Sequence, residues 1–294
     1  MLSPVWFTMP YRFRSTPFVR RLRTVSARGA STILFLLLVC ALLPAVELKQ
    51  VTLQAWAAYV QSVNSAMEQR ASGRTSFLWA DESPDNVRRL RAGEIIVAKR
   101  DPGKVPHGLI SHWIGATFIP NVTLERVVGV LGDYEHYSDF YKPIVVKSTV
   151  LDRGRDVEKA RLLMMQKAYG VTGAVEIDDE IRNTKLDADR IYSFGNAIRV
   201  QEIADFGRPN EHPYPEDRRP GYVWRTAGVK RLEQRDGGVY VEIETIVLSR
   251  DIPFEFRWLI QPLTDSLPRK LMLETLKDAR DAVVTNNVRI SPEK

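Results

Sequence analysis

Four histidines are the first side chains to consider for metal or acid–base chemistry: His107, His112, His136 and His212. A zinc site needs three or four ligands at a recurrent spacing. His107 and His112 are five residues apart without a matching set of acids, so we predict no metal site. His112 shares a predicted strand face with Ile110 and Ile114. We expect it to contact a ligand if that face is concave, and otherwise to be a hydrogen-bonded structural histidine.

Three arginines lie in or beside predicted strands that are otherwise apolar: Arg199, Arg225 and Arg250. A buried guanidinium needs a partner. The acids that could form structural ion pairs with them are Glu202, Glu242, Glu244 and Asp251. The alternative is that one arginine binds a ligand carboxylate or phosphate through two parallel hydrogen bonds.

The sequence contains no motif of the common catalytic classes. It has no Gly-x-Ser-x-Gly, no P-loop, no Gly-x-Gly-x-x-Gly and no zinc-protease pattern. Its single cysteine, Cys40, lies inside an apolar run near the N-terminus. We therefore assign no catalytic residue and expect no cofactor.

The element that positions the remaining side chains is a long helix predicted over residues 266–284, after a short helix at 254–263. Its apolar stripe, at helical spacing, consists of Met272, Leu276, Ala279 and Val283. Ser266 can cap its start, and Pro268 suits its first turn. A helix that follows a series of strands buries such a stripe on the concave side of a bent antiparallel sheet.

Alternation and turn residues predict the strands of that sheet: 109–119, 144–151, 160–167, 171–182, 191–203, 222–234 and 239–248. Val239, Val241 and Ile243 alternate with polar residues, which is typical of a strand buried on one face. A helix over residues 124–141, capped by Thr123, follows the first strand. The proline-rich segment 206–220 is predicted to be a surface loop that cannot form a strand.

Residues 47–105 are predicted to form an extension packed on the main domain, with a helix at 47–70, a turn at 83–85 and a short strand at 94–98. Residues 1–46 carry six arginines and no acid, whereas the remainder carries 36 basic and 36 acidic residues. A neutral body does not attract nucleic acid over distance, so we predict no nucleic-acid partner.

The uncharged run at 33–46, which follows these arginines in the sequence, predicts a bacterial secretory signal with cleavage after Ala45. The protein would then be exported to the periplasm or secreted. The alternative is an uncleaved inner-membrane anchor, with membrane association through residues 33–46. The tail at 285–294 is polar and expected to be flexible.

The order of strand, helix, about six antiparallel strands and long C-terminal helix resembles the START-like superfamily. The resemblance is strongest in the segment 113–143. There a predicted strand is followed by a helix and then by an aromatic–proline corner at Phe140, Tyr141 and Pro143. The resemblance covers residues 109–284. It implies an α+β helix-grip fold, in which a curved antiparallel sheet of about six or seven strands grips the C-terminal helix, here with an extra N-terminal helix.

It further implies an apolar pocket between sheet and helix over residues 106–284. The candidate pocket residues are His112, Trp113, Tyr134, Tyr141, Tyr192, Arg199, Trp224, Arg225, Met272 and Leu276. The first hypothesis is a protein that binds or carries a lipid, isoprenoid or quinone. The alternatives are a cyclase or dehydratase on the same fold and an envelope interaction protein with a vestigial pocket. The residue pattern does not fix the oligomeric state.

Overall fold

A computed structural model describes residues 48–168, 171–214, 223–251 and 254–285. The predicted leader (1–46) and the tail beyond 285 lie outside the described residues. Within the described part, none of the helices combines the length and the apolar character that crossing a membrane requires.

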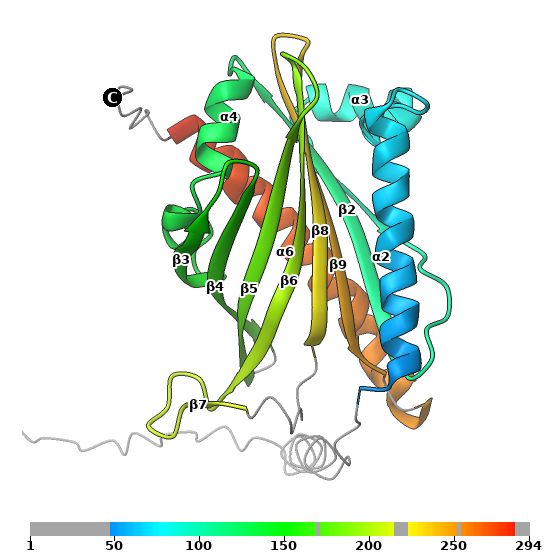
Figure 1. The fold of residues 1–294 in the computed structure, drawn as a ribbon, viewed down its shortest axis with the longest axis vertical. Helices are drawn as coiled ribbons and strands as arrows, with labels where there is room; N and C mark the ends of the chain where they lie inside the picture. The colour runs from blue at the N-terminus through cyan, green and yellow to red at the C-terminus, as the bar shows by residue number, and fades with distance from the viewer. Residues whose placement is uncertain (1–47, 169–170, 215–222, 252–253, 286–294) are drawn as a thin grey trace, which may run out of the picture. The chain divides into compact units, whose positions relative to one another are not determined.

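The fold is α+β, and its centre is a curved, unclosed antiparallel sheet in the order β1-β2-β9-β8-β6-β5-β4-β3 (Figure 1). A two-residue strand, β7, pairs with the end of β6. The strands are β1 (Ile96–Arg100), β2 (Gly108–Pro120), β3 (Val145–Arg153), β4 (Val157–Ala168), β5 (Val171–Lys185), β6 (Arg190–Ala204), β7 (His212–Pro213), β8 (Val223–Arg235) and β9 (Gly238–Arg250).

The helices are α2 (Gln50–Ala71), α3 (Pro84–Arg91), α4 (Leu124–Leu131), α5 (Tyr137–Phe140) and α6 (Phe254–Thr285), with short 3-10 turns at Ala80–Glu82 and Tyr134–His136. In Figure 1, α6 crosses one face of the sheet and α2 runs beside β2 on the other. We call the face against α6 concave and the face against α2 outer.

The long C-terminal helix packs its predicted stripe against the concave face. Met272 and Leu276 are buried in one cluster with Trp113 and Ile119 of β2. Gly115 allows this close approach, because a Cβ there would lie 2.6 Å from Leu276 Cδ1. The predicted break between residues 263 and 266 is wrong, since α6 is continuous. A proline inside a helix removes one hydrogen bond and bends the helix, and does not always end it.

The predicted extension adds both a helix and a strand to the domain. Trp56 of α2 packs with Trp224 and Ile246 on the outer face. β1 pairs with β2 along its whole length, from Ile96 opposite Ala116 to Arg100 opposite His112. The extension therefore covers the outer face at β2, β9 and β8. The first residues of β9, Gly238 to Glu242, are buried on both faces, where the alternation predicted burial on one.

Three further predictions were wrong in detail. The helix predicted over 124–141 ends at Leu131, and the chain continues as a 3-10 turn and the short α5. Gly132, its C-cap, is a poor helix former. The turn predicted at 83–85 is the start of α3, with Pro84 in its first turn. The segment 206–220 contains the strand β7, because an edge strand tolerates Pro213. Thr123 caps α4 as predicted, accepting from Arg126 N at 3.3 Å.

Candidate functional site

The concave face is apolar but incompletely packed. Leu162, Met164, Ile191 and Ile243 contact the buried cluster around α6, yet each is only half-buried. Thr245 is exposed, although it lies on the same face in the central strand β9. Its neighbour in β8 is Gly228, which has no side chain to cover it. Solvent therefore reaches the concave face at the centre of the sheet.

Lys230 points from β8 onto this concave face. Its register partners are Ile243 of β9 and Ser193 of β6. Its Nζ donates to the carbonyl oxygen of Leu131 at 2.6 Å and lies 5.7 Å from the centroid of the Tyr134 ring. Burial lowers the pKa of Lys230 to about 8, although the charge of Glu158 opposes the shift. At neutral pH the site therefore holds an ammonium group that titrates in a mildly alkaline range.

Three tyrosines form one wall near Lys230. The rings of Tyr134 and Tyr137 have centroids 4.7 Å apart, and those of Tyr137 and Tyr141 are 4.9 Å apart. Tyr137 Oη donates to Leu131 O at 2.6 Å. Burial raises the pKa of each of the three phenols. The wall therefore consists of neutral, polarisable rings.

Asp179 is a second polar group on this face. It lies directly opposite Ala160, which packs with Tyr134 and Ile181. Burial, with a smaller contribution from the charge of Asp178, raises the pKa of Asp179 to about 6. A half-buried carboxyl group of this kind binds its proton more tightly than an exposed one.

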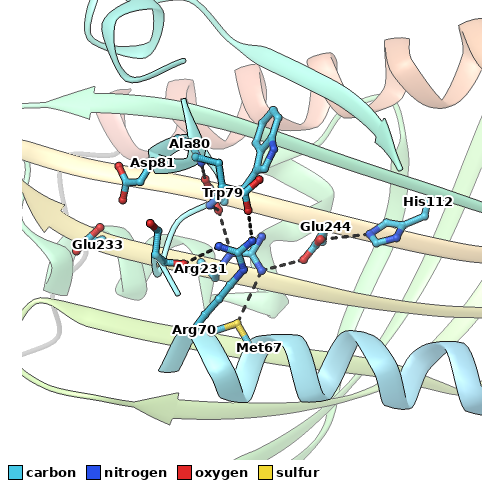
Figure 2. Close-up of polar contacts among 12 residues, drawn as sticks. Met67, Arg70, Trp79, Ala80, Asp81, His112, Arg231, Glu233 and Glu244 are labelled. Atoms are coloured by element: carbon cyan, nitrogen blue, oxygen red, sulfur yellow. Dashed lines mark hydrogen bonds and ion pairs between the residues drawn. The ribbon is translucent and has the colours of Figure 1, made fainter. Parts of the chain in front are cut away.

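A network of charged side chains occupies the outer face under α2 (Figure 2). Arg231 of β8 donates from Nε to Glu242 Oε2 at 2.9 Å and from Nη1 to Glu244 Oε2 at 2.8 Å. Glu242 also accepts from the backbone N–H groups of Trp79 (2.9 Å) and Ala80 (2.8 Å). The network therefore ties the extension to the centre of the sheet.

The same network continues to His112 of β2. His112 Nε2 lies 3.3 Å from Glu244 Oε1, and its Nδ1 is 2.7 Å from Tyr59 Oη of α2. Burial opposes ionisation of Glu244, but the contacts with His112 and Arg231 prevail and lower the pKa of Glu244 to about 2. A pocket of about 340 Å³ adjoins these groups, and it is also lined by Met67 and Arg100.

The candidate pocket residues are divided between the two faces. Trp113, Tyr134, Tyr141, Met272 and Leu276 belong to the concave side or its wall. His112, Tyr192 and Trp224 pack on the outer side. Even-numbered positions of β2 face α2, so the face that carries His112 is the outer one. His112 is therefore the hydrogen-bonded histidine of the second interpretation and not a contact on the concave face.

Arg199 and Arg225, the two arginines among the candidate pocket residues, have partners within the protein. Arg199 Nη1 donates to Glu176 Oε1 at 2.6 Å, next to the Arg161–Asp178 pair. Arg225 Nη1 donates to the backbone oxygen of Trp224 at 2.7 Å. The interpretation of Arg199 as a structural ion pair is confirmed, although its partner is not one of the acids that we proposed.

Sequence reasoning missed Lys230, Asp179 and Arg231. The sequence could have indicated that Lys230 is a buried charge, because its neighbours on the same strand face, Gly228 and Leu232, are both uncharged. The indication for Arg231 was weaker: Ala227 and Val229, which precede it on the other strand face, are apolar. Among the described residues, no group of three or more His, Cys, Asp or Glu could hold a metal ion.

No family model matches the sequence, and no curated protein matches it. Solved structures similar to this chain include a STAR-related lipid transfer protein from Xanthomonas axonopodis, with 19% identity, a TM-score of 0.46 and coverage of 65% of this chain and 93% of that one. A Streptomyces aromatase/cyclase shares 11% identity with a TM-score of 0.43, covering 60% and 94% of the two chains.

A human StAR-related lipid transfer protein shares 14% identity with a TM-score of 0.41, covering 75% and 97%. These likenesses concern the fold alone and assign no ligand. The structure itself has the α+β helix-grip arrangement that the sequence predicted, with a curved antiparallel sheet and the long C-terminal helix on its concave face.

Proposed function

We propose that this domain binds an apolar small molecule, such as a lipid, isoprenoid or quinone, on its concave face. The observation that carries the proposal is the exposure of Thr245 among half-buried aliphatic side chains in the middle of the sheet. An apolar surface open to solvent gains about 25 cal/mol for each Å² that a ligand covers. Polar groups at its margin, such as Lys230, would then fix the orientation of the ligand.

The enzyme alternative loses most of the residues on which it rested. A cyclase or dehydratase needs polar side chains that face each other across the ligand. His112 and Tyr192 lie on the outer face, and Arg199 is paired with Glu176. The alternative of an interaction surface concerns the segment 206–220, of which residues 215–220 lie outside the described part of the chain. Binding or carriage is therefore the function that we favour.

Native mass spectrometry of the protein purified from a bacterial host, followed by organic extraction, tests the proposal. We expect an apolar molecule bound in a 1:1 ratio. Leu162→Trp should reduce its occupancy, because the larger ring would fill the concave face beside a half-buried position. Ile198→Trp is the control, since Ile198 is 55% exposed and should leave occupancy unchanged. Empty wild-type protein that binds no hydrophobic dye would overturn the proposal.

We also propose that the protein acts outside the cytoplasm, on the basis of the arginine-rich segment and the apolar run at 33–46. Intact-mass analysis of protein recovered from the periplasm or the medium tests this proposal. A mature chain that starts at residue 46 would support cleavage. Full-length protein in the membrane fraction would support the anchor, and full-length protein in the cytoplasm would refute export.

A further inference from the structure

We propose that the concave site selects an apolar ligand with a single carboxylate head group, and that Lys230 binds this head group. The inference rests on the proposed function and goes further by naming the chemical class of the ligand. It begins from the contacts of one side chain.

Lys230 is a charged donor whose capacity is only partly used. An ammonium group has three N–H donors and no acceptor. One donor is used by Leu131 O at 2.6 Å, and the Tyr134 ring lies near the charge. Among the residues that the structure describes, Lys230 has no further hydrogen bond and no ion pair within 4.0 Å. Two donors are therefore available to a ligand.

Three polar side chains near Lys230, those of Glu158, Ser193 and Tyr137, already have partners. Glu158 of β4 is 3.1 Å from Arg153 Nε. Ser193 of β6 donates to Asn183 Oδ1 at 2.6 Å. Tyr137 donates to Leu131 O, and burial keeps the phenols of Tyr134 and Tyr137 neutral. Lys230 is thus the group on this part of the concave face that offers both charge and unused donors.

The position of Lys230 is set by the end of α4. Leu131 is the last residue of that helix, and its carbonyl is one of those that lack a partner within the helix. The negative end of the helix dipole also stabilises a cation there. The ammonium group is therefore fixed between the helix end and the apolar side chains of the sheet, where a ligand tail would lie.

A carboxylate matches this environment better than a phosphate. One ammonium group balances one negative charge. A phosphate monoester carries about −1.5 to −2 charges and three strong acceptor oxygens, which need more donors than a single lysine supplies. The half-buried neighbours of Lys230 are apolar or already paired, so we infer a monocarboxylic acid with an aliphatic or isoprenoid tail.

Competition against a hydrophobic dye with two ligands of equal chain length tests the inference. Dodecanoate carries the charge, and 1-dodecanol does not. We expect wild-type protein at pH 7 to prefer dodecanoate by about 10-fold to 100-fold, the range for one hydrogen bond to a charged group. Lys230→Met should abolish the preference and retain dodecanol binding. Lys159→Met, at the exposed Lys159–Glu180 pair, is the matched control and should retain the preference.

The possible results separate the two proposals. Equal affinity of the wild type for both ligands overturns the head-group inference and leaves apolar binding intact. A preference that survives in Lys230→Met overturns the role of Lys230. Failure of the wild type to bind either ligand or the dye overturns the proposed function itself. The preference should also weaken as the pH rises from 7 to 9.5, because the ammonium group loses its proton.

Discussion

Arg231 and Glu242 form an ion pair, with 2.9 Å between Nε and Oε2, in which neither side chain has appreciable contact with solvent. The two residues are on adjacent strands, and the cover over them comes from a segment about 160 residues earlier in the chain. Their pairing therefore depends on the extension, and the extension depends on Glu242 for two of its backbone hydrogen bonds.

Replacing one member of this pair should be strongly destabilising. We expect Glu242→Gln to lower the free energy of unfolding by about 3–5 kcal/mol, because Arg231 would keep only one of its two carboxylate partners in a buried site. Urea denaturation at pH 7 measures the change. Glu180→Gln is the control: its pair with Lys159 is exposed, and the change should stay within about 0.5 kcal/mol. If Glu242→Gln also changed the free energy of unfolding by no more than about 0.5 kcal/mol, the stabilising role assigned to the Arg231–Glu242 pair would be contradicted.

Lys230→Met should stabilise the unliganded protein near neutral pH. The pKa of Lys230 is about 8 in the folded state and 10.5 for the ordinary side chain. The folded state therefore carries a penalty that is complete below pH 8 and absent above pH 10.5. We expect a gain of about 3 kcal/mol at pH 7 that falls below about 1 kcal/mol at pH 10. Denaturation curves at the two pH values check this, and a gain independent of pH would argue against a buried ammonium.

Asp179→Asn should also stabilise the protein, but in a different pH range. The pKa of Asp179 rises from 3.8 to about 6, so the folded state retains full stability below pH 3.8 and loses some as the pH rises through 6. We expect a gain of up to about 3 kcal/mol at pH 7.5 and almost none at pH 4. Asp152→Asn, at an exposed position of β3, should have little effect at either pH.

Gly115→Ala tests the contact between the sheet and α6. The added Cβ would lie 2.6 Å from Leu276 Cδ1 and 2.8 Å from Met272 Cγ, so the helix or its side chains must move. We expect a loss of about 1–3 kcal/mol in thermal or urea unfolding. Gly129→Ala in α4 meets no atom within 4 Å and should instead gain about 0.5–1 kcal/mol. If Gly115→Ala left the stability unchanged, α6 would not be tightly packed against β2.

The sequence predicted the features that depend on local patterns. The stripe from Met272 to Val283 fixed the face of α6 that meets the sheet, and Thr123 located the start of α4. Asp236 and Gly237 marked the turn between β8 and β9, where both have positive φ. Each of these patterns involves residues that are close together in the sequence, so a single sequence is enough to detect it.

The outer face could not be predicted in the same way. Alternation along β9 looks the same whether Glu242 and Glu244 face water or a buried arginine. Only the distant backbone of Trp79 and Ala80 distinguishes the two cases. The direction of His112 was equally ambiguous, because a strand has two faces and the sequence does not say which is concave.

β1 belongs to the extension in sequence but forms the border of the sheet in space, next to β2. A chain that began at residue 106 would leave the β2 backbone from His112 to Ala116 without its hydrogen-bonding neighbour. Such a bare border recruits strands from other molecules and promotes aggregation. The extension thus places the five-residue strand β1 at the border in place of the 13-residue strand β2, and a short edge strand is a poorer template for pairing with other molecules.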